Sequence, residues 1–281
     1  MKKYLIMSAN ILLYLAIYFF AQVIAGGVIG AVVAFTYMAR SGGAIKADTI
    51  SKLMNPYILW IMFFAVIITL PVYILIFRSR KLNFLDFCRF KNIKIKGIGL
   101  LGLLGVSVSL MLCGVLNMLP IEKWFPDYNK VIDAALNSSP NILVILLITG
   151  ILIPIFEEIL FRGIIYGELK SKIPVTAAII IQAALFGIYH MNLLQGMYAF
   201  AFGIIFALVY EWFGTIWASV TVHIFINSTS TVLSGILSQE VVNKFNVLIL
   251  TLSSLFVVGL ILLAHRYRIK DKDVEVDENP V

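Results

Sequence analysis

The sequence predicts an all-α integral membrane protein with about eight transmembrane helices, and three observations support this fold class. Hydrophobic residues make up 61% of the 281 residues and charged residues only 13%, with a mean hydropathy of +0.98. Soluble domains carry about 25% charged residues, so this composition excludes a water-soluble fold. Apolar stretches of about 20 residues, the length needed to cross a bilayer core, recur along the chain. The Lys and Arg residues are concentrated in alternate loops.

Eight apolar stretches are the predicted helices, taken in order from the N-terminus. The first follows Lys2 and Lys3, as a signal-peptide core would. Its uncharged run over 4–39 greatly exceeds the usual core of about 7–15 residues, so we expect a retained helix. Pro174 marks the turn between the fourth and fifth stretches, and Gly214 the turn between the sixth and seventh. The predicted helices cover residues 4–37, 56–77, 97–119, 141–167, 174–193, 196–213, 215–236 and 245–264.

The distribution of basic residues predicts that both termini face the cytoplasm. With the N-terminus inside, cytoplasmic segments carry 16 of the 22 Lys and Arg residues, seven of them in the loop 78–96. This bias follows the positive-inside rule, so the net charge of +7 reflects topology and no nucleic-acid partner is expected. The loop 78–96 also has the composition to bind anionic lipid headgroups, although a topology anchor alone is the simpler interpretation.

The chain is predicted to be a single integral membrane domain over 1–265, in a bacterial cytoplasmic membrane. Residues 266–281 are low in hydrophobicity and are expected to form a disordered cytoplasmic tail. Cys88 falls in a loop and Cys113 in a helix, so neither a disulfide nor a cysteine-type metal site is predicted.

The fourth apolar stretch carries adjacent acids, Glu157 and Glu158, and a base, Arg162. A charged side chain in hydrocarbon costs at least about 2.5 kcal/mol, so such residues are read as functional. Residues four apart share a helix face, which predicts a Glu158–Arg162 ion pair. Glu157 lies about 100° around the helix and is left as the free carboxylate. The alternative, that both acids only hold helices together, accounts poorly for an unpaired acid.

Two of the three histidines, His190 and His223, also fall within predicted membrane helices. Pro174 lies near the midpoint between Glu157 and His190, so an antiparallel hairpin would bring these two groups level with each other. His223 and Asn227 are four apart and point the same way, as do Phe186 and His190. An imidazole above a carboxamide on one face supplies the donors that an oxyanion site needs.

These residues resemble the CPBP family of intramembrane proteases, which includes the type II CAAX prenyl endopeptidases and the Abi or bacteriocin-immunity proteins. The family patterns are EExxxR, FxxxH and HxxxN, and all three are complete and in order here. The resemblance covers about 140–230. The matching residues are Glu157, Glu158 and Arg162, then Phe186 and His190, then His223 and Asn227.

The resemblance implies a role for each residue. Glu157 would activate the attacking water with help from His190, while His223 and Asn227 would stabilise the oxyanion. Glu158 would assist as a further catalytic residue, and Arg162 and Phe186 would shape the site. Zinc bound by Glu157, His190 and His223 is the alternative, but no HExxH motif is present and Asn is a poor zinc ligand, so we prefer the metal-free route.

The predicted function is an intramembrane endopeptidase that cuts a peptide bond near a membrane-embedded or lipidated, CAAX-like segment. Its expected partners are membrane lipid and a peptide or protein substrate, either prenylated or bacteriocin-like. The main alternative is a non-proteolytic regulator or bacteriocin-immunity protein with the same fold. A transporter using the acids as a proton relay is a third class, but the sequence shows no inverted repeat.

Overall fold

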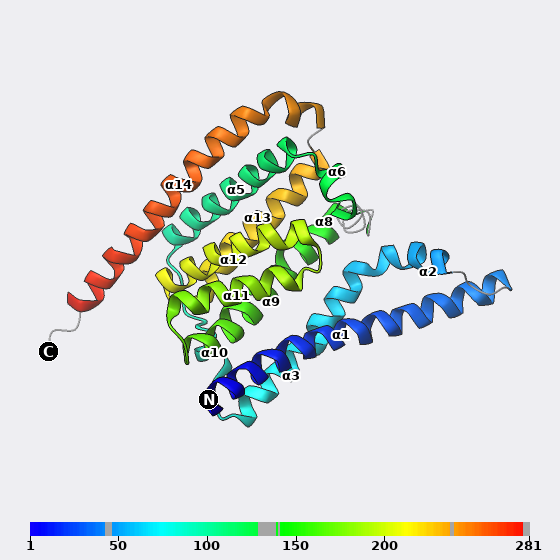
Figure 1. Cartoon of the computed structure of the whole chain (residues 1–281), viewed down its shortest axis with the longest axis horizontal. Coiled ribbons are helices and arrows are strands. Elements are labelled where there is room, and N and C mark those ends of the chain that lie inside the picture. The colour runs from blue at the N-terminus through cyan, green and yellow to red at the C-terminus, as the bar shows by residue number, and fades with distance from the viewer. Residues whose placement is uncertain (43–46, 129–138, 140, 237–238, 278–281) are drawn as a thin grey trace.

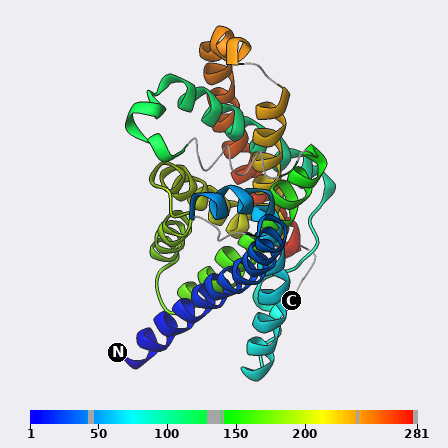
Figure 2. The ribbon, with the colours of Figure 1, turned by 90° about the vertical axis from the view of Figure 1, so that its right-hand side faces the viewer.

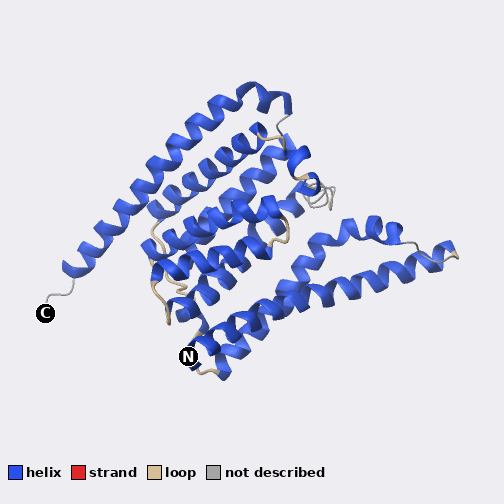
Figure 3. Ribbon diagram, in the orientation of Figure 1, coloured by secondary structure: helices blue, strands red, loops and turns tan. Residues whose placement is uncertain are grey.

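The computed structural model of the chain consists of helices joined by loops (Figures 1 and 3). The structure describes residues 1–42, 47–128, 139, 141–236 and 239–277, and no strand occurs among them, which confirms the all-α fold class. Parts of the predicted outer loops, at 43–46, 129–138, 140 and 237–238, and the end of the tail at 278–281 lie outside the described residues. The elements are α1 (Lys2–Ser41), α2 (Ala47–Met54), η1 (Asn55–Tyr57), α3 (Ile58–Ser79), α4 (Phe84–Phe87), α5 (Ile95–Met118), α6 (Ile121–Trp124), α8 (Ile142–Ile145), η2 (Leu146–Leu152), α9 (Ile153–Glu158), η3 (Ile159–Ile165), α10 (Tyr166–Lys170), α11 (Val175–Tyr189), α12 (Leu193–Phe213), α13 (Ile216–Ile236) and α14 (Gln239–Asp277).

Seven helical spans within the described residues are long and apolar enough to cross a membrane, so the chain is an integral membrane protein. The remaining predicted helix, the fifth in order at 174–193, corresponds to α11, which has only 15 residues. At 1.5 Å per residue it is about 22 Å long, short of the roughly 30 Å bilayer core. The predicted range 174–193 was too long because α11 ends before His190 and Asn192 caps the next helix, accepting a hydrogen bond from the Gln195 backbone N–H at 3.0 Å.

The C-terminal helix α14 differs from the prediction in length. It continues to Asp277, through most of the tail that we expected to be disordered. The sequence between 260 and 279 holds neither Gly nor Pro, the residues that most strongly end a helix, and Pro280 lies beyond its last residue. In both views α14 begins near the top of the molecule, whereas the N-terminal end of α1 lies near the bottom (Figures 1 and 2).

One end of the bundle gathers the segments predicted to be cytoplasmic. The N-terminal end of α1, the α3–α4 loop, α10 and the last turns of α14 lie toward this end (Figure 1). Two acids bind the basic groups there: Glu168 pairs with Arg80, and Glu211 with Arg89 at 2.8 Å and Lys170 at 2.5 Å. Two arginines of the basic loop are therefore held by the protein itself. Which side of the membrane this end faces stays a prediction.

The fourth membrane span, Ile142–Lys170, alternates between two helix types. Two seven-residue π-helical segments, η2 and η3, flank the six-residue α9. In a π-helix each N–H bonds to the carbonyl five residues back, and such segments occur often at functional sites. Glu157 and Glu158 are the last two residues of α9, so they lie between two changes of helical register.

Two close helix contacts support the helices that carry the histidines. A Cβ on Gly105 of α5 would lie 2.6 Å from the Val222 carbonyl oxygen, so only glycine lets α5 approach α13 this closely. A Cβ on Gly187 of α11 would likewise lie 2.5 Å from the Gly196 carbonyl oxygen of α12. Such small-residue contacts are typical of membrane helix packing.

Candidate active site

Glu158 is the centre of a buried charge cluster. Its side chain is fully buried, as is that of Arg162 one turn later. The Arg162 Nη1 and Glu158 Oε1 atoms are 3.0 Å apart, which is the ion pair expected from their spacing. None of the three guanidinium nitrogens has a hydrogen bond of good geometry to the described residues. The guanidinium instead lies over the rings of Phe186, at 4.3 Å, and Phe206, at 4.8 Å, in cation–π contact.

His223 on α13 lies between the two glutamates. Its Nδ1 is 2.8 Å from Glu158 Oε1, and its Nε2 is 3.6 Å from Glu157 Oε2. Because Glu158 Oε1 already faces a cation and acts as an acceptor, we assign the proton to Nδ1. When His223 is neutral, its Nε2 lone pair points toward Glu157. When the ring carries a second proton, its Nε2–H points toward Glu157 instead. The Phe206 ring stacks on the imidazole, with centroids 4.6 Å apart and an angle of 23° between the planes.

His190 lines the same cavity as Glu157 and hydrogen-bonds to its own helix. Its Nδ1 is 2.8 Å from the Phe186 carbonyl oxygen, and a carbonyl only accepts, so we place a proton on Nδ1 and leave Nε2 as an acceptor. The Phe186 ring also packs edge-on against the imidazole. Among the described residues, no ion pair within 4.0 Å joins His190 to Glu157. The imidazole nearest to Glu157 is therefore that of His223.

Asn227 binds the backbone of the fourth span. Its Nδ2 donates to the Thr149 carbonyl oxygen at 3.1 Å, and Ser228 Oγ donates to the Gly150 carbonyl oxygen at 3.3 Å. Pro154 lacks the one N–H that would serve the Gly150 carbonyl in an α register or the Thr149 carbonyl in a π register. The two side chains on α13 supply a donor to each of these carbonyls, so the one that loses its backbone partner is satisfied, and one N–H of Asn227 is left for other contacts.

A cavity of about 1290 Å³ brings the predicted residues together. Glu157, Phe186, His190, His223 and Asn227 all line it, whereas the fully buried Glu158 and Arg162 lie behind its wall. The cavity extends to the exposed residues Glu122 and Lys123 of α6, which gives it a polar rim. Water could reach Glu157 by this route. A carboxylate with access to water, surrounded by imidazole and amide groups, is suited to acid–base chemistry.

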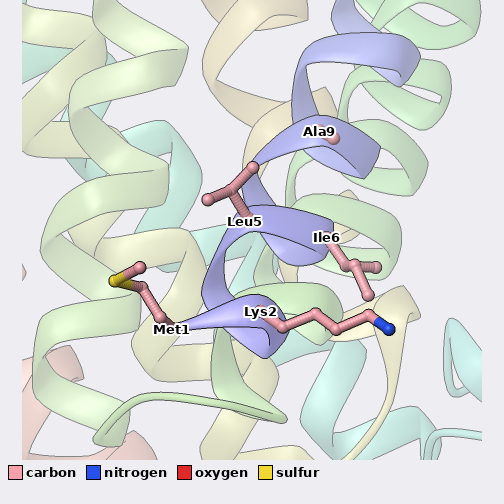
Figure 4. Close-up of a pocket in the computed structure, with 5 residues that line it drawn as sticks. All are labelled: Met1, Lys2, Leu5, Ile6 and Ala9. Atoms are coloured by element: carbon pink, nitrogen blue, oxygen red, sulfur yellow. The ribbon is translucent and has the colours of Figure 1, made fainter.

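A second, smaller pocket lies at the N-terminal end of α1, distant in sequence from these groups (Figure 4). The residues that line it are Met1, Lys2, Leu5, Ile6 and Ala9. They include a single ionisable side chain and no acid or imidazole. We assign no chemistry to this pocket.

The zinc alternative can be tested against the donor set. Among the described residues, no group of three or more His, Cys, Asp and Glu side chains lies close enough to hold a metal ion. Nδ1 of His223 faces Glu158, and Nδ1 of His190 faces a backbone carbonyl, so Nε2 of each ring is the nitrogen that could still bind a metal. Because the described side chains are not grouped closely enough to hold an ion, we derive no step through a metal, and the zinc alternative stays a prediction.

Two tyrosines beside Glu157 were not predicted from the sequence. Tyr18 on α1 and Tyr189 on α11 line the same cavity as Glu157. Tyr189 directly precedes His190, which was a signal that could have been used. Tyr18 offered no signal beyond a polar tip in an apolar helix, because its approach to the acids depends on how α1 packs.

These features define a membrane-embedded protein with an acid–imidazole site on a large cavity. Residues 139–229 match the family model described as type II CAAX prenyl endopeptidase, Rce1-like. The family resemblance predicted from the three motifs is therefore confirmed over this segment, which holds every residue of those motifs.

Two curated proteins of Bacillus subtilis (strain 168) are similar to the chain. It is 35% identical over 83 residues to "Putative membrane peptidase YdiL", a match that covers 30% of this chain and 34% of that protein. It is 31% identical over 131 residues to "Uncharacterized protein YpbD", covering 44% of this chain and 64% of that protein. The matches thus span less than two thirds of either relative. No solved structure matches the chain.

Proposed function

We propose that the protein is a membrane-embedded endopeptidase that hydrolyses its substrate with water activated by Glu157. The observation that carries the proposal is the position of His223, with one ring nitrogen on the buried Glu158 and the other facing the cavity acid Glu157. A role in packing alone requires neither an acid that lines a cavity nor an imidazole held in one tautomer. The family match and the name of one relative support a peptidase.

In the proposed reaction, Glu157 takes a proton from a water molecule as that water attacks the peptide carbonyl. The proton then passes to the departing amine, which completes hydrolysis. Glu158 holds His223 by its Nδ1 proton, and the ring, protonated on both nitrogens, donates Nε2–H to the oxyanion in this proposal. The second N–H of Asn227 is the other proposed donor. His190, with Nε2 free to accept, assists proton transfer from the far side of the cavity.

The cavity also supports a substrate with an apolar segment. Its walls combine aliphatic side chains such as Ile58, Met62 and Leu116 with the polar groups around Glu157. A peptide embedded in the membrane or carrying a lipid, whether prenylated or bacteriocin-like, could place its apolar part there and its peptide bond at the acid. We also propose a bacterial cytoplasmic membrane as the location, since both relatives come from Bacillus subtilis.

The test is a cleavage assay in proteoliposomes with a panel of farnesylated and unmodified peptides, read by mass spectrometry. Glu157→Gln should abolish cleavage while the protein still folds, because the carboxamide keeps the shape of the side chain but cannot accept the proton. Glu240→Gln removes an exposed acid on α14 and is the matched control. Equal cleavage by the unaltered chain and Glu157→Gln would refute the proposed base. No cleavage of any peptide by the unaltered chain would favour the non-proteolytic alternative.

A further inference from the structure

The large cavity lies on one side of Glu157, as its described lining residues show. On α5 and α13 these residues begin at Ser109 and His223 and continue toward the C-terminal ends of the two helices. On α3 they are Ile58 and Met62, in the first two turns. These ends of the helices lie toward α6, on the side of the molecule away from α10 and the N-terminal end of α1 (Figure 1). Glu157 and His223 therefore form the floor of a cavity that extends toward α6.

On the other side of Glu157 the fourth span is buried throughout. Every residue from Glu158 to Tyr166 is buried, whereas the part of the span before Glu157 alternates between buried and more exposed positions. The side chains of Glu158 and Arg162 have no exposed surface, and the Arg162 guanidinium lies over the Phe206 ring at 4.8 Å. Protein interiors pack as densely as organic crystals, so such a segment leaves no continuous path for water or a peptide.

The loop 78–96 closes the bundle at the end of this buried segment. A Cβ on Gly163 would lie 2.7 Å from Cys88 Sγ, so the loop packs directly against the fourth span. The Thr215 hydroxyl, just before α13, donates to the Lys91 carbonyl oxygen at 2.6 Å, which ties the loop to that helix as well. The route that reaches Glu157 from α6 is therefore blocked before this end of the bundle.

The closed end carries most of the positive charge of the chain. The segments predicted to be cytoplasmic, which gather at this end, hold 16 of the 22 Lys and Arg residues. At the rim of the cavity, α6 has one acid, Glu122, and one base, Lys123. The positive-inside rule therefore predicts that the closed end faces the cytoplasm and that the cavity opens on the opposite face of the membrane.

We infer that the site receives its substrate from the extracytoplasmic face of the membrane and cuts an exported, membrane-bound polypeptide there. The aliphatic cavity walls would hold an apolar part of that polypeptide, and the bond to be cut would reach Glu157 from the α6 end. A substrate segment in the cytoplasm would have to pass the buried residues from Glu158 to Tyr166 to reach the same acid. The class of substrate rests on the proposed function, whereas the side of access does not.

Cysteine labelling tests the side of access without any activity. Ser230 and Ser219 lie on α13 on either side of His223, and Ser230 lines the cavity whereas Ser219 is fully buried. Lys172, in the turn between α10 and α11, is exposed at the closed end. The variants Ser230→Cys, Ser219→Cys and Lys172→Cys are treated with a membrane-impermeant maleimide, once in intact cells and once in sealed inverted vesicles.

The native cysteines set the background of this experiment. Cys113 lines the cavity, so each variant also carries Cys113→Ala. Cys88 is buried and is retained, and the protein with Cys113→Ala alone gives its labelling. Each variant is first shown to melt in detergent as the Cys113→Ala protein does. If Ser219→Cys fails that check, the other two variants still decide the side of access.

We expect Ser230→Cys to be labelled in intact cells and Lys172→Cys in inverted vesicles, each from one side of the membrane. Ser219→Cys should be labelled in neither preparation, because it lies beyond the floor of the cavity. Labelling of Ser230→Cys in inverted vesicles, of Lys172→Cys in intact cells, or of a folded Ser219→Cys in either preparation would overturn the inference. Ser230→Cys that stays unlabelled in both would overturn it as well.

The class of substrate is tested with a peptide that the unaltered protein cleaves in detergent, fitted with a charged tag that cannot cross the membrane. Intact cells that express the chain should cleave this peptide, cells with Glu157→Gln should not, and sealed inverted vesicles should leave it uncut. Glu157-dependent cleavage in inverted vesicles, or only after detergent has opened the membrane, would overturn the inference. Failure of the proposed function would appear instead as an absence of Glu157-dependent cleavage in every preparation, detergent included, and the labelling would still decide the side of access.

Discussion

Replacing Arg162 by Ala should destabilise the protein by about 3 kcal/mol, near the lower end of the 3–5 kcal/mol found when one partner of a buried ion pair is removed. The Arg162 and Glu158 side chains are both fully buried and their charges lie 3.0 Å apart, so Arg162→Ala would leave the Glu158 carboxylate uncompensated. We expect the lower end because His223 Nδ1, at 2.8 Å, still donates to Glu158. The loss of the cation–π contacts with Phe186 and Phe206 adds to the cost.

The assay is the free energy of unfolding in mixed micelles, obtained by titration with a denaturing detergent. Arg78→Ala, at an exposed arginine near the end of α3, is the control and should change that free energy by no more than about 0.5 kcal/mol. The double variant Arg162→Met, Glu158→Gln should recover much of the stability that Arg162→Ala loses. It removes both charges of the pair, so no buried charge is left without its partner. Arg162→Ala with the stability of the unaltered protein would refute this reasoning.

Two further predictions concern Asn227 and metal. Asn227→Ala should lower kcat by roughly 10²–10³ with little change in KM if it supplies an oxyanion donor. Ser228→Ala, which removes the neighbouring contact to the same π segment but does not line the cavity, should leave kcat nearly unchanged; similar losses in both variants would show a structural role for Asn227 instead. If zinc is required, the purified protein should contain it in stoichiometric amount and lose it with His190→Ala or His223→Ala. Full activity in chelator from protein found metal-free by elemental analysis would support the glutamate route, and zinc lost together with activity would contradict it.

The parts of the site that follow from helical spacing could be predicted from the sequence. Glu158 and Arg162 are one turn apart, and they form the expected ion pair. The hairpin around Pro174 was expected to bring Glu157 and His190 together, and both line the same cavity. The ion pair depends only on helical spacing, and the placement of Glu157 and His190 depends on the single turn at Pro174. A single sequence specifies both well.

The remaining relations depend on packing between distant segments. The sequence placed His190 level with Glu157 and gave His223 the oxyanion role, but spacing does not say which imidazole each acid meets. That choice follows from the close approach of α13 to the fourth span, where Asn227 and Ser228 bind the carbonyls of Thr149 and Gly150. The π segments were also not predicted, because the apolar residues around Glu157 and Glu158 show no clear change of period. Pro154 was the only local sign, and its effect depends on which donors a neighbouring helix provides.

In the proposed reaction, the charges of the site allow an acid to act as a base inside a membrane. With Glu157 and Glu158 ionised and both Arg162 and the His223 ring that donates to the oxyanion protonated, the four groups carry no net charge. When Glu157 takes a proton from water, its negative charge moves to the hydroxide and then to the oxyanion, so the total does not change during the reaction. No additional charge has to be created in the apolar surroundings, where an isolated one would be costly. A single glutamate without Arg162 and Glu158 could also accept the proton. It would lack the oriented His223 that donates a hydrogen bond to the oxyanion in the proposed reaction. In the proposed mechanism, the second acid and its arginine therefore orient the imidazole and leave Glu157 free for the proton.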